Sequence, residues 1–297
     1  MAARRADSAC LLRHRRQRTH VPPSGLSAPP CRRWVAGRRV SEPGERARGA
    51  RRWVDVRVPG RRSLVVAVGL VALAVVVGVG GWLFWLPAWR PALQAGERYG
   101  IDVSAHQGEI DWAAVARDDI EFAYLKATEG GDFTDRRFRL NWIGADRAGL
   151  QRGAYHFYSL CSAGDAQARH FLSVAAPDPH TLPPALDLEL AGNCRSRPQP
   201  QALRRELGVF LTTVEAAWSR QILLYLGDDF EAEYRIRDHV HRSLWQPNFL
   251  RRPSGDDWAI WQVGGFSRVT GISGRVDLDV GRPCHLGPGP TCQPRSP

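Results

Sequence analysis

Two acidic residues lie at the end of a predicted strand, with a spacing that suits acid–base chemistry. In the segment PALDLE (184–189), Asp187 and Glu189 are separated by one residue. Because side chains alternate between the two faces of a strand, both carboxyl groups are expected on the same side of the sheet. Two buried carboxyls close together raise the pKa of one of them, so one group stays protonated near neutral pH while the other is ionised. Glycoside hydrolysis needs this arrangement, although a solvated pair of acids at a strand end would give the same short pattern.

The segments around this pair predict an α/β fold. From Tyr99 onward, apolar runs alternate with amphipathic stretches, and the last runs are separated by loops alone. The predicted strands are 99–104, 122–127, 153–158, 184–189, 222–226, 243–245, 258–263 and 275–278. The predicted helices are 112–117, 133–148, 163–174 and 199–218, with one short helical stretch after 226. Repeated strand–helix units of this length predict a parallel sheet that closes into a barrel.

A barrel of this kind places its chemistry at the carboxyl ends of its strands. Asp102 and Asp277 also lie at predicted strand ends, so we expect them at the barrel mouth beside Asp187 and Glu189. There they would orient a substrate and tune the carboxyl pair, or they would make structural hydrogen bonds only.

Six blocks of sequence resemble one family. They are GIDVSAHQGEIDW (100–112), LKATEG (125–130), GAYHFYS (153–159), LDLE (186–189), IWQ (260–262) and GRVDLD (274–279). In this order they are similar to family 25 glycoside hydrolases, the bacterial and phage-type lysozymes, over about residues 98 to 281. The resemblance implies a flattened TIM-like barrel of five strand–helix units followed by three strands, (β/α)5(β)3. It also implies N-acetylmuramidase activity on the glycan strands of peptidoglycan, with no cofactor.

The resemblance assigns roles to the acids. Glu189 is the expected general acid, which protonates the oxygen of the β-1,4 bond between N-acetylmuramic acid and N-acetylglucosamine. Asp187 is expected to assist attack by the acetamido group of the substrate, and Asp102 and Asp277 line the mouth. A non-catalytic sugar-binding protein on the same barrel and a chitinase-like glycosidase are the alternatives.

Aromatic and amide side chains near the strand ends are candidates for sugar binding. Tyr155, Tyr225, Trp245 and Trp261 are predicted platforms for a pyranose ring, with core packing as the alternative for each, and Gln107 and Gln262 are candidate hydrogen-bond partners. Lys126, the only lysine, is a further cleft candidate. The segments SLWQPNF (243–249) and WQVGGFS (261–267) lack the Trp-x-Ala-x-Tyr and Trp-Gln-Tyr-like runs of many members, so the substrate subsites are expected to differ. No metal-binding motif is present in the sequence.

The net charge of +11 comes from the N-terminal region. Residues 1–62 hold 17 arginines and four acids, whereas the remaining chain has a net charge of −2. The catalytic domain therefore has no overall positive field for nucleic acid. The tail has few regularly spaced apolar residues, which predicts disorder.

Residues 63–86 contain no charge and are long enough to cross a bilayer as a helix. Arginines crowd the N-terminal flank and tryptophans follow the apolar stretch, which predicts a cytoplasmic N-terminus. We therefore expect a single-pass protein of the bacterial inner (plasma) membrane with a periplasmic or extracellular catalytic domain; a cleaved signal peptide is the alternative. The expected organisation is a tail at 1–62, a membrane helix at 63–86, a linker at 87–97, the catalytic domain at 98–283 and a C-terminal tail at 284–297. The sequence indicates no oligomeric state.

Four cysteines lie in the exported part: Cys161, Cys194, Cys284 and Cys292. Their irregular spacing argues against zinc and favours disulfides in an oxidising compartment. Three pairings are open. Cys161 with Cys194 and Cys284 with Cys292 is the favoured one, because the first two follow neighbouring strands of the predicted barrel and the last two close a short loop.

Overall fold

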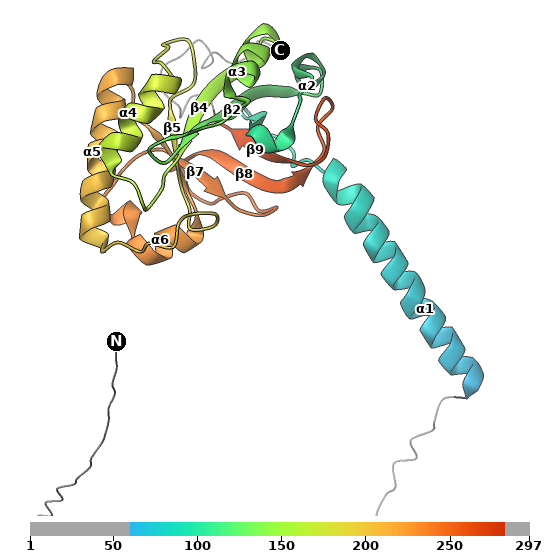
Figure 1. The fold of residues 1–297 in the computed structure, drawn as a ribbon. Coiled ribbons are helices and arrows are strands. Elements are labelled where there is room, and N and C mark those ends of the chain that lie inside the picture. The colour runs from blue at the N-terminus through green and yellow to red at the C-terminus, as the bar shows by residue number, and fades with distance from the viewer. Residues whose placement is uncertain (1–59, 283–297) are drawn as a thin grey trace, which may run out of the picture. The chain divides into compact units, whose positions relative to one another are not determined.

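The computed structural model describes residues 60–282, which contain an N-terminal helix and an α/β barrel (Figure 1). The strands are β1 (Arg98–Val103), β2 (Ile120–Glu129), β3 (Phe133–Thr134), β4 (Gln151–Phe157), β5 (Ala185–Leu188), β6 (Leu223–Leu226), β7 (Leu244–Pro247), β8 (Trp258–Ser267) and β9 (Val276–Gly281). The helices are α1 (Arg61–Gly80), α2 (Trp112–Ala116), α3 (Phe138–Arg147), α4 (Gly164–Val174), α5 (Pro200–Trp218) and α6 (Asp228–Tyr234).

Within these described residues, eight strands close into a barrel in the order β1, β2, β4, β5, β6, β7, β8, β9. The barrel strands β1, β2, β4, β5, β6, β7 and β8 pair in parallel in this order, and β9 pairs antiparallel with both β8 and β1, which closes the barrel. A helix follows each of β1, β2, β4, β5 and β6, although the short strand β3 intervenes after β2, and no helix follows β7 or β8. The predicted (β/α)5(β)3 architecture is therefore confirmed.

Aromatic rings fill the lower part of the barrel interior. The interior cluster includes Phe122, Tyr124, Tyr155, Leu223, Trp245 and Ile260, whereas the alternate residues of the strands pack outward against the helices. Two glycines make room for the rings: a Cβ on Gly100 would lie 2.2 Å from the Phe122 ring, and one on Gly153 would lie 2.3 Å from the Tyr124 ring. Because these rings fill the interior toward the amino ends of the strands, space for a ligand remains at the carboxyl ends.

The predicted helix 133–148 is wrong at its beginning. Phe133 and Thr134 form β3, which pairs antiparallel with the end of β2, and α3 begins only at Phe138. Asp135 stands between the two elements and is buried. Its Oδ1 accepts a hydrogen bond from the backbone N–H of Arg137 at 2.8 Å, and its Oδ2 accepts one from Ala105 at 2.8 Å. The pairing of β3 with β2 and the hydrogen bonds of Asp135 therefore set the start of α3. The apolar spacing in the sequence continues through this point and does not mark it.

The N-terminal helical segment runs from Arg61 to Ala88 and contains the predicted apolar stretch. After α1 the chain forms a π-helical turn at Gly81–Trp85 and a 3-10 turn at Leu86–Ala88. The large apolar side chains between Leu64 and Val79 are exposed in the structure. Among residues 60–282, this segment is the one helix that is long and apolar enough to span a bilayer.

The interval 87–97, expected as a linker, instead packs on the barrel domain. Pro87 and the preceding Leu86 are buried, and the carbonyl of Pro87 accepts a hydrogen bond from the N–H of Arg268 at 2.8 Å. Arg90 forms an ion pair with Asp118, with 2.8 Å between Nη2 and Oδ2. Charged and polar groups of the segment thus find partners on the domain, which sequence spacing did not reveal. The expected tail up to residue 59 lies outside the described residues, as does the expected C-terminal tail with Cys284 and Cys292.

Candidate active site

A cavity of about 460 Å³ opens at the carboxyl ends of the barrel strands. All four predicted acids line it: Asp102 from β1, Asp187 from β5, Glu189 just beyond β5, and Asp277 from β9. The antiparallel register of β1 and β9 places Asp102 opposite Asp277. We call this space the carboxylate cavity.

Glu189 lies where β5 gives way to a loop. Leu188 ends the strand, and its carbonyl accepts a hydrogen bond from the N–H of Gly227 at 2.9 Å. A Cβ on Gly227 would lie 3.2 Å from the Cβ of Glu189, so the absence of a side chain there leaves room for the acid. Burial raises the pKa of Glu189 to about 7, and the nearby charge of Asp229 contributes to the rise.

Asp187 is deeper in the cavity than Glu189. Its burial raises its pKa well above the ordinary value, and the charge of Glu189 raises it further, while the Lys126 ammonium acts in the opposite direction. Within residues 60–282, its buried Oδ1 has no hydrogen-bond partner. Buried carboxylate oxygens are normally paired, so this atom is available to a substrate group that donates a hydrogen bond.

A chain of hydrogen bonds joins three predicted site residues. The Tyr225 hydroxyl donates to Oε1 of Gln262 at 3.1 Å, and Nε2 of Gln262 donates to Oδ2 of Asp102 at 2.8 Å. All three side chains line the carboxylate cavity. The contacts orient the Gln262 amide and hold the Asp102 carboxyl in one position.

Asp279 is a buried acid that sequence reasoning did not select. Its Oδ1 accepts a hydrogen bond from Nε1 of Trp245 at 3.0 Å, and burial together with the charge of Asp277 raises its pKa well above the ordinary value. The segment VDLD (276–279) has the same alternation as LDLE, so the signal was present in the sequence. Glu129, which also lines the cavity, was not selected either.

The aromatic candidates divide into two groups. Tyr155, Tyr225 and Trp245 line the carboxylate cavity, although Trp245 is only 2% exposed and forms its floor. Trp261 does not line it, and its prediction as a sugar platform is wrong. Its Nε1 donates to the carbonyl of Asn248 at 2.7 Å, and the Arg252 guanidinium lies 5.2 Å from its ring centroid. Adjacent residues of a strand face opposite ways, so Gln262 and Trp261 cannot both face the cavity.

Two further polar candidates also line the cavity. Gln107 has part of its amide engaged, because its Oε1 accepts a hydrogen bond from the N–H of Ser104 at 2.9 Å. Lys126 donates to Oε2 of Glu129 at 2.7 Å, and its ammonium lies 4.7 Å from the centroid of the Phe157 ring. Lys126 therefore places a positive charge among the acids. Within residues 60–282 there is no group of three or more His, Cys, Asp or Glu side chains arranged to hold a metal ion.

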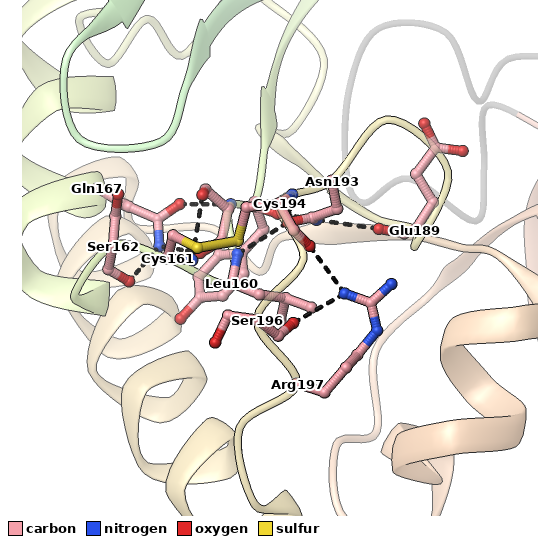
Figure 2. Close-up of a disulfide and its surroundings, with 11 residues drawn as sticks. Leu160, Cys161, Ser162, Gln167, Glu189, Asn193, Cys194, Ser196 and Arg197 are labelled. Atoms are coloured by element: carbon pink, nitrogen blue, oxygen red, sulfur yellow. Dashed lines mark hydrogen bonds between the residues drawn. A yellow bond between two sulfur atoms is a disulfide. The ribbon is translucent and has the colours of Figure 1, made fainter. Parts of the chain in front are cut away.

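A disulfide and an asparagine connect the loops beside Glu189 (Figure 2). Cys161 and Cys194 form the bond that the sequence favours, with their Cα atoms 6.2 Å apart. Nδ2 of Asn193 donates to the carbonyl of Tyr158 at 2.7 Å and to that of Glu189 at 3.0 Å. Oδ1 of Asn193 accepts from the N–H groups of Leu160 and Cys194. Figure 2 shows the Glu189 carboxyl pointing away from the disulfide and from Asn193. These contacts therefore hold the backbone of Glu189 and do not involve its carboxyl group.

Comparison with known proteins agrees with this geometry. The model of the glycosyl hydrolases family 25 matches residues 101–272. Lysozyme M1 of Streptomyces globisporus is 34% identical over 193 residues, which is 60% of this chain and 65% of that protein. The uncharacterized protein YegX of Escherichia coli K12 is 34% identical over 190 residues, which is 61% of this chain and 68% of that protein.

Solved structures show the same likeness. A family 25 glycosyl hydrolase from Bacillus anthracis is 30% identical, with a TM-score of 0.57, and the alignment covers 65% of this chain and 94% of that one. A bacterial lysozyme from Streptomyces coelicolor is 31% identical, with a TM-score of 0.54 over 61% of this chain and 90% of that one. The family match covers more than half of the chain and includes the end of β1, all of β5 and the acids Asp102, Asp187 and Glu189. The chain therefore belongs to family 25 of the glycosyl hydrolases.

Proposed function

We propose that this glycoside hydrolase is a lysozyme that cleaves the β-1,4 bond between N-acetylmuramic acid and N-acetylglucosamine in peptidoglycan. The observation that carries the proposal is the pairing of Glu189 with Asp187 in the carboxylate cavity, two residues apart at the end of β5. The names of the relatives, Lysozyme M1 and the autolytic lysozyme of Clostridium acetobutylicum, support the choice of substrate.

Glu189 is the proposed general acid. With a pKa of about 7 it carries a proton in part of the population at neutral pH, and it gives that proton to the glycosidic oxygen as the bond to C1 breaks. The leaving sugar departs with a free hydroxyl. In the second half of the reaction the Glu189 carboxylate takes a proton from the water that attacks C1.

Asp187 is the proposed partner of the substrate acetamido group. Its unpaired Oδ1 accepts a hydrogen bond from the acetamido N–H, which directs the acetamido oxygen toward C1 and stabilises the positive charge that develops on the group. The Lys126 ammonium acts against the rise in the Asp187 pKa that burial and the Glu189 charge cause. Asp102, held by Gln262, and Asp277 are proposed to orient the same sugar.

The membrane location is also a proposal. The helix Arg61–Ala88 has the length and composition of a membrane span, and the arginine-rich flank before it favours a cytoplasmic N-terminus. The barrel would then lie outside the bacterial plasma membrane, where peptidoglycan is found. The packing of Leu86 and Arg90 on the domain leaves little free chain between the helix and the barrel.

Digestion of purified peptidoglycan tests the proposed reaction. The full chain in detergent is the appropriate sample, because a fragment that begins near residue 96 would lose the Pro87 and Arg90 contacts. Products with N-acetylmuramic acid at the new reducing end are expected. New N-acetylglucosamine ends, or cleavage of chitin oligosaccharides instead of peptidoglycan, would contradict the bond specificity. Absence of any new reducing end would favour a sugar-binding protein.

A further inference from the structure

A second cavity, of about 610 Å³, lies beside the carboxylate cavity. It is lined by Asp228, Asp229, Pro247, Asn248, Phe249, Gln262 and Gly264. Gln262 lines both cavities, so the two spaces adjoin at this side chain. The second cavity is therefore a candidate extension of the active site.

An exposed aromatic surface forms one side of this second cavity. Phe249 is 56% exposed, and its ring packs edge-on against Phe266 with 5.2 Å between the ring centroids. A Cβ on Gly264, which has a φ of +145°, would lie 2.6 Å from the Phe266 ring and 3.1 Å from the Phe249 ring. Because Gly264 has no side chain, the Phe249 and Phe266 rings can both pack against its backbone in β8. We call Phe249, Phe266 and Gly264 the Phe249 ledge.

The ledge is assembled from the two segments that depart from the runs of many family members, 243–249 and 261–267. They are tied together by backbone hydrogen bonds, from the N–H of Asn248 to the carbonyl of Gln262 at 3.1 Å and from the N–H of Leu250 to that of Val263 at 3.0 Å. The two segments therefore form one local surface.

Glu189 lines the carboxylate cavity and lies near a residue that lines the second cavity. Its side chain lines the carboxylate cavity, while Asp229, which lines the second one, is its neighbour across Gly227. A Cβ on Gly227 would lie 3.2 Å from the Glu189 Cβ and 3.0 Å from Asp229 Oδ1. A general acid protonates the oxygen that joins two sugars, so one sugar must lie on each side of it.

We propose that the Phe249 ledge binds the leaving-group sugar, N-acetylglucosamine, while the carboxylate cavity holds N-acetylmuramic acid. This assignment rests on the proposed function and adds the position of the second sugar. The exposed ring offers an apolar face to the C–H groups of a pyranose, and Asn248 and Asp228 offer polar atoms to its hydroxyls. Because the proposed bond breaks at C1 of N-acetylmuramic acid, the sugar on the leaving-group side of Glu189 is N-acetylglucosamine.

Two substrates separate this subsite from the rest of the reaction. In an uncrosslinked glycan strand the leaving group is a sugar, so its cleavage depends on the leaving-group subsite. In the β-glycosyl fluoride of an oligosaccharide that ends in N-acetylmuramic acid the leaving group is fluoride, so no sugar occupies that subsite. With the full chain in detergent, Phe249→Ala is expected to lower kcat/KM on glycan strands about tenfold, because the ring that packs on the sugar is lost. Hydrolysis of the fluoride is expected to stay within about twofold of the unaltered chain.

Two further variants serve as controls. Phe249→Tyr keeps a ring at the ledge and is expected to retain most of the activity on strands. Leu140→Ala removes a side chain of α3 that is 62% exposed and does not line either cavity, and it is expected to change neither rate.

The outcomes are distinguishable. If Phe249→Ala leaves strand hydrolysis unchanged, or lowers the two rates equally, the ledge is not the leaving-group subsite. If the unaltered chain hydrolyses neither substrate, the proposed function itself is wrong, and the subsite assignment falls with it.

Discussion

The two sides of the active site are held in different ways. Beside β4 and β5, the Cys161–Cys194 disulfide and the four hydrogen bonds of Asn193 fix the chain around Glu189. Beside β7 and β8, backbone hydrogen bonds and one ring contact support Phe249, whose side chain stays largely exposed. In the sequence, LDLE is one of the six blocks that resemble the family, whereas 243–249 is expected to differ from many members. We call the β4–β5 side, which holds the proposed acid, the rigid side, because a disulfide and four side-chain hydrogen bonds link its loops. The β7–β8 side holds the proposed leaving-group subsite and has fewer such links.

The largest expected effect comes from the acid on the rigid side. Glu189→Gln keeps the size and the hydrogen-bonding capacity of the side chain but removes the proton, so turnover on peptidoglycan should fall by about 10²–10⁴. Reducing-end release measures the rate, and circular dichroism checks the fold. Glu233→Gln, the same change at an exposed position of α6, is the matched control. Near-normal hydrolysis by Glu189→Gln would mean that another group is the acid.

Removal of the disulfide should weaken the rigid side as a whole. The bond closes a loop with a sequence separation of 33, for which chain entropy predicts about 3–4 kcal/mol of stability. The double variant Cys161→Ser with Cys194→Ser should therefore unfold at lower denaturant concentration and hydrolyse glycan strands more slowly. Loss of stability with an unchanged rate would show that the bond stabilises the domain without positioning Glu189.

Asn193 tests the same side without breaking a covalent bond. Asn193→Ala removes the donor to the Glu189 carbonyl and leaves the N–H groups of Leu160 and Cys194 without their acceptor. We expect kcat to fall about tenfold with little change in KM, because the acid loses its position while the sugar contacts remain. Steady-state kinetics on soluble glycan strands measure the split. A rise in KM with unchanged kcat would assign Asn193 to substrate binding instead.

The smallest effect concerns the junction of the two sides. As the proposed general acid, Glu189 would act in its protonated form, so the rate should decline as pH rises through about 7. The negative charge of Asp229 helps to raise this pKa, so Asp229→Asn should move the alkaline limb of the pH–rate profile to lower pH by a fraction of a unit. The limb of kcat/KM on glycan strands gives the value. A limb that does not move, or moves upward, would contradict the coupling of Asp229 to Glu189.

Local alternation along strands was enough to predict much of the site. Asp187 and Glu189 share a face because side chains in a strand have a period of two, and this holds wherever the strand is placed. The Cys161–Cys194 pair was also predictable, because parallel strands that are neighbours in the chain end on the same side of a barrel. The same rule of alternation, applied to Asp277, would have identified Asp279.

Tertiary structure decided the features that depend on contacts between distant segments. Alternation shows that Trp261 and Gln262 face opposite ways, but the packing of β8 in the barrel selects which of them reaches the cavity. The docking of 87–97 depends on Arg90 finding Asp118, which lies 28 residues further along the chain. Phe249 and Phe266 meet only because β8 lies beside the segment that follows β7. Sequence periodicity determines which side chains share a face of one element, whereas register and packing between elements determine which faces meet.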